Sequence, residues 1–371
     1  MTNFEIYTYL KSKNGGGGEP VPVPVTNPAL RLMDWEGTVL KEYTAEQVAS
    51  LTALPDPSSL NVNVDRDLLT FQGYNWVLAD IKAWVTAHEG QCLTVGAIYT
   101  TTDEQDHTFR NNPRINTSES VSMLKKGTTS IRNNMFYNCY SLTNINIPDG
   151  VTTIGNNAFN GCYSLTSINI PDSVTTIREG MFGHCYSLTT VNIPDSVTNI
   201  ESNMFYNCYS LTTVNIPDSV TSIGSHAFFS CYSLTTVNIP DGVTNIEYAT
   251  FFNCYSLTNI NIPDSVTNIG DKAFRNCYSL TNISIPDSVT AIGTSAFLGC
   301  SCLTDIVIKG NPNLTGVDAF SDIYSSYLIY VPRAKLSWYS TATNWTTLYN
   351  NGKIVAIEDN AEYLESIGID V

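Results

Sequence analysis

The stretch of sequence that decides the fold is residues 138–159, which read N-C-Y-S-L-T-N-I-N-I-P-D-G-V-T-T-I-G-N-N-A-F. Closely similar stretches follow along the chain, and their cysteines fall at a constant step of 23 residues, at Cys139, Cys162, Cys185, Cys208, Cys231, Cys254, Cys277 and Cys300. A fixed period of this length is typical of solenoid proteins, in which each repeat forms one coil and stacks on the next. The repeats therefore predict one elongated domain, although 371 residues would otherwise suggest several compact ones.

A single copy shows how each coil is expected to fold. Leu142, Ile145 and Ile147 follow the leucine-rich spacing L-x-x-L-x-L, which turns these side chains inward and leaves the polar residues between them outside. The sequence P-D-G at 148–150 predicts a turn, because proline presets one dihedral angle and Asp can hydrogen-bond the downstream chain. A second apolar run, which ends at Phe159, closes the coil.

One coil cannot be stable alone. It buries roughly seven apolar side chains at ~1.5 to 3 kcal/mol each, whereas ordering each residue costs ~1 to 2 kcal/mol of backbone entropy. Stacking must supply the rest, so we expect a mainly β leucine-rich repeat solenoid of about nine coils over residues 122–322. The aromatic-rich segment 323–371 is expected to cap its exposed end.

The chain before the repeats is different in composition. Residues 1–14 are expected to form an anchor peptide, and 15–28 a Gly/Pro-rich linker that combines a swivel with a semi-rigid spacer. Residues 29–113 predict a small α/β head: a hairpin near its start, a helix capped by Thr44, a second helix over 77–88 and a strand over 92–100.

The quoted repeat closely resembles the BspA-type leucine-rich repeat of bacterial, protist and phage-encoded surface proteins. The match covers about residues 122–331, eight copies agree, and the tail I-Y-V-P followed by A-T-N-W resembles that family's usual terminal segment. The resemblance implies adhesion or ligand binding without catalysis.

The head also resembles a known module, the Listeria-Bacteroides type surface repeat, which is small and β-grasp-like. The matching residues are L-R-L-M-D-W-E-G-T-V-L at 30–40 and T-F-Q-G-Y-N-W at 70–76, and the inserted N-V-N-V-D-R-D at 61–67 departs from that pattern. Similar heads joined to such repeats, behind a short peptide and a glycine run, look like phage and prophage proteins of gut bacteria.

The charge balance limits the partners. With 34 acidic and 18 basic residues the formal charge is -16, which repels nucleic acid and anionic lipid. Only 14% of residues are charged, so the surface is expected to be neutral and hydrogen-bonding, which suits a glycan or a protein. The start of the chain shows no secretory signal, and no stretch is apolar enough for membrane insertion.

Repetition turns each consensus position into a stripe, and the first stripe is aromatic. It consists of Tyr140, Tyr163, Tyr186, Tyr209, Tyr232, Tyr255 and Tyr278. Exposed aromatic faces at regular spacing could stack on sugars or form a protein-binding hot spot. The alternative is a ladder that packs only on itself and stiffens the edge.

The copies differ most between the last isoleucine and the cysteine. One column of this segment holds Tyr206, Phe229, Phe252 and Arg275. These residues are the second candidate ligand-binding set, although solvent positions also vary without any functional reason.

Two further stripes suggest metals or disulfides only weakly. The acidic stripe is Asp149, Asp172, Asp195, Asp218, Asp241, Asp264 and Asp287. Turn chemistry suffices to explain it, and calcium remains an alternative with few ligands per coil. The cysteines point into the core in parallel, which favours buried free thiols over disulfides or a tetrahedral zinc site. No metal and no cofactor are predicted.

No catalytic motif is found. The four histidines lack metal-ligand spacing, and nucleophile-elbow and phosphate-binding glycine motifs are missing. We therefore expect no enzyme but a recognition protein, carried on a virion through residues 1–14 and binding a host surface protein or glycan. The alternatives are a bacterial or protist cell-surface adhesin and a structural spacer or decoration protein. The sequence leaves oligomerisation open.

Overall fold

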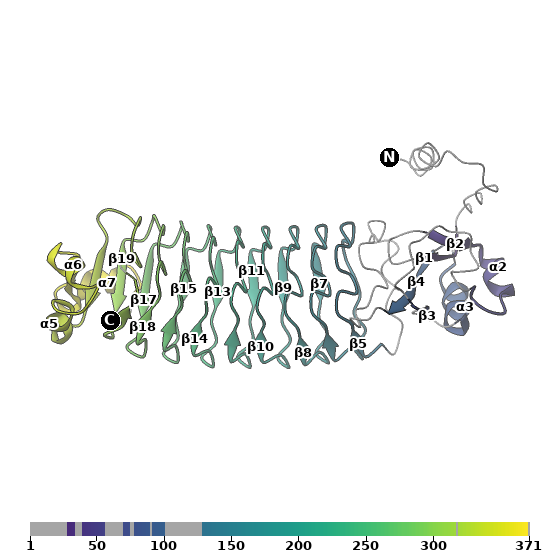
Figure 1. The fold of residues 1–371 in the computed structure, drawn as a ribbon, viewed down its shortest axis with the longest axis horizontal. Helices are drawn as coiled ribbons and strands as arrows, with labels where there is room; N and C mark the ends of the chain where they lie inside the picture. Colours follow the sequence, from purple (N-terminus) through teal and green to yellow (C-terminus); the bar gives the residue numbers. More distant parts are fainter. Residues whose placement is uncertain are drawn as a thin grey trace, which may run out of the picture.

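The computed structural model describes residues 28–33, 39–55, 70–74, 78–89, 91–100, 128–316 and 318–369. The predicted anchor at 1–14 and all but the last residue of the predicted linker at 15–28 lie outside these residues, so both remain predictions. The described residues form a small α/β unit and a long β solenoid (Figure 1). None of their helices is both long enough and apolar enough to cross a membrane.

The α/β unit is a four-stranded mixed sheet with two helices. The sheet order is β2-β1-β4-β3, with β1 and β4 parallel in the centre and the outer strands antiparallel to them. Its elements are β1 (Leu30–Met33), β2 (Val39–Tyr43), α2 (Ala45–Ser50), β3 (Thr70–Tyr74), α3 (Leu78–Ala87) and β4 (Leu93–Thr100). Thr44 caps α2 in a capping box with Gln47, as the sequence predicts for the start of this helix. Leu32, Ile81 and Val95 are buried between sheet and helices.

The solenoid has two ladders of parallel strands, and the first holds the shorter ones. Each residue pairs with its equivalent one coil away, as Thr153 does with Thr176. In chain order the strands are β5 (Ser130–Ile131), β6 (Thr153–Ile154), β8 (Thr176–Ile177), β10 (Asn199–Ile200), β12 (Ser222–Ile223), β14 (Asn245–Ile246), β16 (Asn268–Ile269), β18 (Ala291–Ile292) and β20 (Asn313–Leu314).

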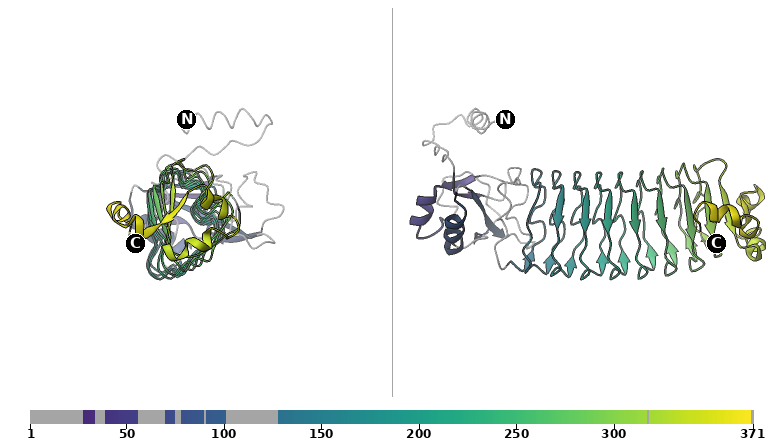
Figure 2. Two further views of the ribbon diagram at one scale, coloured as in Figure 1. Left: turned by 90° about the vertical axis from the view of Figure 1, so that its left-hand side faces the viewer. Right: turned by 180° about the vertical axis from the view of Figure 1, so that it is seen from behind.

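The second ladder forms the strand face of the rod. Its strands are β7 (Ser167–Asn169), β9 (Thr190–Asn192), β11 (Thr213–Asn215), β13 (Thr236–Asn238), β15 (Asn259–Asn261), β17 (Asn282–Ile285), β19 (Asp305–Ile308), β21 (Leu328–Val331) and β22 (Ile354–Ala356). An isolated bridge between Asn146 and Asn169 extends it by one rung. The described residues thus form about ten coils, which confirms the predicted solenoid with one coil more than expected. Seen end-on, the coils superpose (Figure 2).

The core is built from columns of identical side chains. Leu142, Ile145 and Ile147 are buried as predicted. A phenylalanine column runs the length of the rod, with neighbouring ring centroids 5.1 to 6.1 Å apart. Its members are Phe136, Phe159, Phe182, Phe205, Phe228, Phe251, Phe274, Phe297 and Phe320.

The cysteine column lies beside the phenylalanines. From Cys162 to Cys300 each cysteine is a buried free thiol. Each donates its S–H to the carbonyl of the phenylalanine 26 residues earlier, at 3.1 to 3.3 Å. Burial raises the pKa of the Cys162 and Cys185 thiols well above the ordinary value for cysteine. The predicted buried free thiols are confirmed for these residues.

Aromatic residues close the C-terminal end of the core. Trp345 packs against Phe320 with ring centroids 5.9 Å apart and meets the Tyr339 ring edge-on. Trp345 and Tyr339 are fully buried. The Trp345 indole N–H donates to the Pro312 carbonyl at 2.8 Å, and the Tyr339 hydroxyl donates to the Gly310 carbonyl at 2.7 Å. Trp345 thereby packs on Phe320, the last ring of the phenylalanine column.

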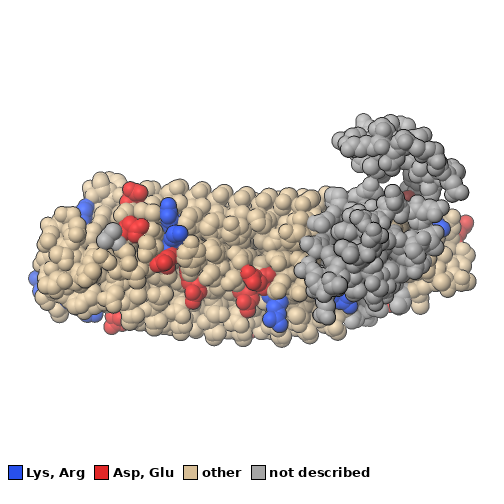
Figure 3. Space-filling view, viewed as in Figure 1, with Lys and Arg blue, Asp and Glu red and all other residues tan. Residues whose placement is uncertain are grey.

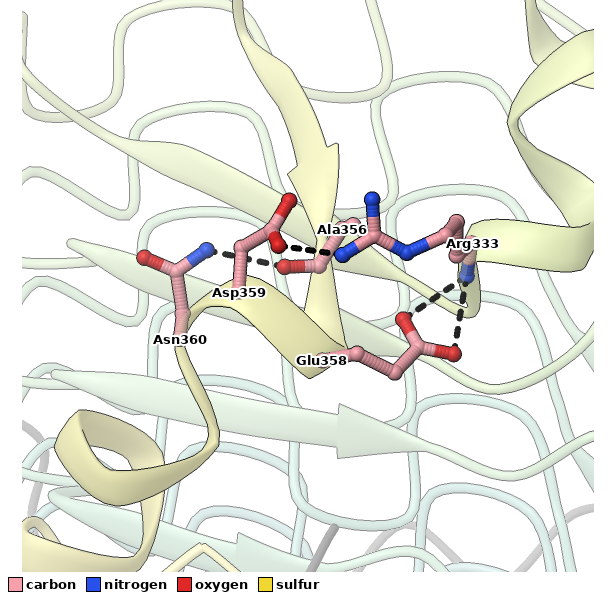
Figure 4. Close-up of polar contacts among 5 residues, drawn as sticks. All are labelled: Arg333, Ala356, Glu358, Asp359 and Asn360. Atoms are coloured by element: carbon pink, nitrogen blue, oxygen red, sulfur yellow. Dashed lines mark hydrogen bonds and ion pairs between the residues drawn. The ribbon is translucent and has the colours of Figure 1, made fainter.

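Short helices follow the last coils and surround this end. They are η2 (Arg333–Lys335), α5 (Leu336–Tyr339), α6 (Thr346–Asn350), η3 (Ile357–Asp359) and α7 (Ala361–Ser366). Figure 4 shows Arg333, which pairs with Asp359 and donates its backbone N–H to the Glu358 carboxylate. Leu364 of α7 packs on Val307 and Tyr330, so α7 covers the strand face over the last coils and leaves the earlier coils uncovered.

Candidate functional site

The variable segment of each coil, which we call the variable edge, has a backbone with two left-handed residues. They lie five residues and one residue before the cysteine, as in Asn203 (φ 59°) and Asn207 (φ 61°). Asn and Gly tolerate this conformation best, which explains why they recur there. Backbone N–H groups also bond the next coil, for example from Phe205 to Ala227 at 2.8 Å. The variable side chains therefore project from a rigid backbone.

The seven tyrosines predicted as a ligand-binding stripe form a continuous stack, here called the tyrosine ladder. Neighbouring ring centroids are 4.5 to 4.8 Å apart, and the planes of Tyr209 and Tyr232 differ by only 1°. Each inner ring is covered on both faces by its neighbours. The ladder therefore presents ring edges and hydroxyl groups to solvent, and stacking of a sugar on an inner ring face is not available.

The stack also changes the ionisation of its hydroxyl groups. Burial raises the pKa of Tyr186, and the neighbouring Tyr163 and Tyr209 raise it further. Burial also raises the pKa of Tyr209, and the neighbouring Tyr232 and Tyr206 raise it further. These hydroxyls remain protonated at neutral pH and can both donate and accept hydrogen bonds.

The second predicted set forms another stack, here called the variable column. Tyr206 and Phe229 lie 4.7 Å apart, Phe229 and Phe252 lie 4.8 Å apart, and the Arg275 guanidinium lies 5.6 Å from the Phe252 ring centroid. All four side chains are half-buried. The structure thus brings together the eleven predicted residues as two parallel stacks.

Three residues that the sequence did not mark lie beside these stacks, and one of them, His184, joins the two. His184 meets the rings of Tyr186 and Tyr206 edge-on, at 5.9 and 5.4 Å. His226 similarly contacts Phe229 and Tyr248, at 5.6 and 5.0 Å. The two histidines lack metal-ligand spacing, and their positions one and five residues before a cysteine place them on the variable edge.

The environment keeps both histidines neutral. Burial lowers the pKa of His184, and burial together with the nearby Lys272 lowers that of His226. Lys272 also contacts Tyr248, because the Lys272 ammonium donates a hydrogen bond to the Tyr248 hydroxyl at 3.0 Å. Figure 3 shows that acidic and basic side chains form only small groups on the face in view, and uncharged side chains form most of it.

A polar depression of about 270 Å³ lies at the end of the variable column. Its lining residues are Asn157, Asn160, Glu179, His184, Asn203 and Tyr206. Asn203 donates to the Glu179 carboxylate at 3.0 Å, and Asn160 donates to the Asn157 side chain at 3.2 Å. This composition offers hydrogen-bond donors and acceptors beside one aromatic ring, which suits noncovalent recognition.

The acidic stripe lies apart from these residues. All seven aspartates are exposed at the turns. The turns themselves are held by backbone bonds such as that from Val174 N–H to the Pro171 carbonyl, at 3.0 Å. In the part of the chain that the structure describes, no group of His, Cys, Asp or Glu has an arrangement suited to a metal ion.

Several solved structures are similar to the chain. A leucine-rich repeat protein from T. pallidum is 36% identical, with 42% of this chain and 74% of that chain covered and a TM-score of 0.41. One from Bacteroides ovatus is 26% identical, with 67% and 74% covered and a TM-score of 0.40. A leucine-rich cell surface protein from Faecalibacterium prausnitzii is 31% identical, with 58% and 80% covered and a TM-score of 0.30.

A family model identifies the repeats. The BspA type leucine rich repeat region matches in six copies at residues 105–235 and 223–342, which together span more than half of the chain. No curated protein matches the chain. Proteins with such repeats are surface proteins, and the match suggests a protein-binding or adhesion role on a fold that is not typical of enzymes. The chain belongs to the BspA-type leucine-rich repeat family.

Proposed function

We propose that this protein is a non-enzymatic attachment protein that binds a host surface molecule through the variable edge of its solenoid. The observation that carries the proposal is the variable column, with its half-buried aromatic side chains on a rigid backbone. The coils are nearly identical elsewhere, so this edge is where the molecule can discriminate between partners. Aromatic and arginine side chains in such settings are enriched among residues that dominate binding energy.

The first experiment compares two faces of the same coils. The triple variant Tyr206→Ser, Phe229→Ser, Phe252→Ser removes the aromatic part of the column, and Thr212→Ala, Thr235→Ala, Thr258→Ala alters exposed positions next to the strand face. We expect the first variant to bind host cells at least tenfold more weakly, and the second to bind within twofold of the parent. Thermal denaturation followed by circular dichroism verifies that both remain folded.

A folded column variant with unchanged binding would contradict the proposal and support a structural spacer. Equal losses in both variants would also contradict it, because binding would then not depend on the variable edge. A third variant, Tyr186→Ser, Tyr209→Ser, Tyr232→Ser, measures the tyrosine ladder separately. We expect a smaller loss there, because its inner ring faces are already covered.

The setting of the protein is the second part of the proposal. We propose that it is carried on a virion, with residues 1–14 as the attachment peptide and 15–28 as the tether. The resemblance of this layout to phage and prophage proteins supports the proposal. Mass spectrometry of purified particles tests it: detection at stoichiometric amounts is expected, and absence from particles contradicts it.

The alternative setting is the surface of a cell, as an adhesin. Membership in a family of surface proteins supports this setting as well. Labelling of intact cells with an antibody against the solenoid distinguishes the two, because a cellular adhesin is detected on cells that release no particles. Binding through the variable edge is expected in either setting.

A further inference from the structure

The variable column is interrupted next to Tyr206. One face of the Tyr206 ring is stacked on Phe229, at 4.7 Å. On its other side the equivalent residue is Gly183, which has no side chain to continue the stack. The His184 ring meets Tyr206 edge-on, at 5.4 Å, and the Asn160 amide lies against Gly183. Tyr206 therefore lines the polar depression with a ring that, unlike the inner rings of the tyrosine ladder, is not stacked on both faces.

The polar groups around this ring come from three successive coils. Asn157 and Asn160 contribute amides from one coil, Glu179 and His184 lie on the next, and Asn203 lies beside Tyr206 on the third. Hydrogen bonds within the group hold the Glu179 carboxylate and the Asn160 amide in place. Carboxylate and amide oxygens retain free lone pairs after these bonds, so they can accept further hydrogen bonds from a ligand.

The charges of the depression favour a neutral ligand. It contains one carboxylate and no lysine or arginine, and the His184 pKa is lowered by burial. An anionic ligand would meet the Glu179 carboxylate in a chain of formal charge -16. A purely apolar ligand would desolvate the carboxylate and amides without compensation. An uncharged ring with hydroxyl groups and an apolar face avoids both the repulsion and the uncompensated desolvation.

We infer that this depression binds the terminal sugar of a neutral oligosaccharide, with an apolar sugar face on the Tyr206 ring and sugar hydroxyls donating to Glu179 and Asn157. The inference rests on the proposed attachment function and names the ligand class of the variable edge. The small volume suits one end of an oligosaccharide more than the middle of a long chain. A single shallow site of this kind binds weakly, so strong attachment requires several copies of the chain.

The test fills the gap in the column. Gly183→Phe adds a ring to the column beside Tyr206 and displaces the Asn160 amide, which lies against the position of the new Cβ and must give up its bonds to Asn157 and the Gly180 carbonyl. Leu298→Phe is the matched control, because Leu298 follows Arg275 at the same position of the next coil and the change adds the same ring four coils away from Tyr206. Glu179→Gln is a second variant that keeps the shape and removes the charge.

The measurement is binding of the full chain, displayed as multiple copies on beads, to immobilised neutral, sialylated and sulfated oligosaccharides. We expect retention of at least one neutral oligosaccharide, a loss of at least tenfold with Gly183→Phe, about fivefold with Glu179→Gln, and less than twofold with Leu298→Phe. Preference for charged oligosaccharides, equal binding by Gly183→Phe, or no retained oligosaccharide overturns the inference. If the protein still binds host cells and neutral oligosaccharides do not compete, the attachment function stands and its ligand is a protein.

Discussion

The strand face and the variable edge belong to the same coils and show opposite uses of repetition. On the strand face, threonines repeat and hydrogen-bond one another's backbone: the Thr212 hydroxyl donates to the Thr189 carbonyl at 3.1 Å, and Asn215 donates to the Asn192 side chain at 3.0 Å. Side chains of one coil thus hydrogen-bond the backbone and side chains of the coil before it. Only the last coils differ, where α7 covers this face.

The variable edge uses the same backbone regularity to hold unlike side chains. Its left-handed residues and inter-coil bonds recur from coil to coil, whereas the residue at the variable column changes from Gly183 to Tyr206, Phe229, Phe252 and Arg275. A perfect ladder covers its own surfaces, as the tyrosine ladder shows. An interruption in a ladder leaves a surface uncovered, and a ligand needs such a surface.

The largest expected effect concerns how each region is anchored in the core. Phe228→Ala removes a fully buried ring stacked on both sides at 5.3 Å, and should destabilise the protein by about 3 to 5 kcal/mol. Val237→Ala, which removes a buried strand-face anchor, should cost about 2 kcal/mol. Urea denaturation followed by circular dichroism measures both. Equal losses would show that the variable edge is not anchored more strongly than the strand face.

The next effect tests the left-handed backbone. Asn207→Val places a β-branched residue at a φ of 61° and should cost about 1 to 3 kcal/mol. Asn207→Gly, the control, keeps the conformation accessible and should cost less. On the strand face the exposed Thr213→Val should change stability by no more than about 0.5 kcal/mol. A small loss for Asn207→Val would mean that the edge backbone can adopt another conformation.

Much of this molecule is predictable because the sequence repeats. The period of 23 residues places every inward residue of a coil once Leu142, Ile145 and Phe159 are recognised, and the structure buries all three. The same arithmetic places Tyr206, Phe229 and Phe252 in one column. The fold and the membership of each stack thus follow from one repeat unit.

The properties of the stacks could not be predicted in the same way. Whether a tyrosine ladder exposes ring faces depends on the rotamers and on the distance between coils, and the 4.5 to 4.8 Å spacing closes those faces. The role of His184 and His226 depends on left-handed backbone angles, which Asn and Gly mark in other coils but a histidine does not. The sequence shows that Gly183 interrupts the variable column. The polar side chains that surround the resulting depression are identified only by the structure.

A smaller effect compares two alanines on adjacent coils. Ala249 has a φ of 52°, and Ala227 lies outside the left-handed positions. Ala249→Gly relieves the conformational cost of a left-handed alanine and should leave stability unchanged or raise it by up to about 1 kcal/mol. Ala227→Gly should lower it by about 1 kcal/mol. The denaturation midpoint of Ala227→Gly should therefore fall, whereas that of Ala249→Gly should rise or stay unchanged.

The smallest effect is the pH dependence that the variable edge adds. The folded-state pKa values of His184 and His226 are lowered by burial, so the unfolded chain binds more protons once the pH falls below its ordinary histidine pKa, about 6.5. Their contribution to stability is complete above that pH and is lost as the pH falls through the folded-state values. The urea midpoint should therefore decrease modestly between pH 7.5 and pH 5, above the range in which most carboxylates titrate.

The double variant His184→Asn, His226→Asn is the control, because it keeps residues suited to the left-handed backbone. Its urea midpoint should decrease less over this range. An unchanged pH dependence in the double variant would assign it to groups other than these two histidines. The strand-face residues of β9, β11, β13 and β15 carry no titratable side chains and cannot be its source.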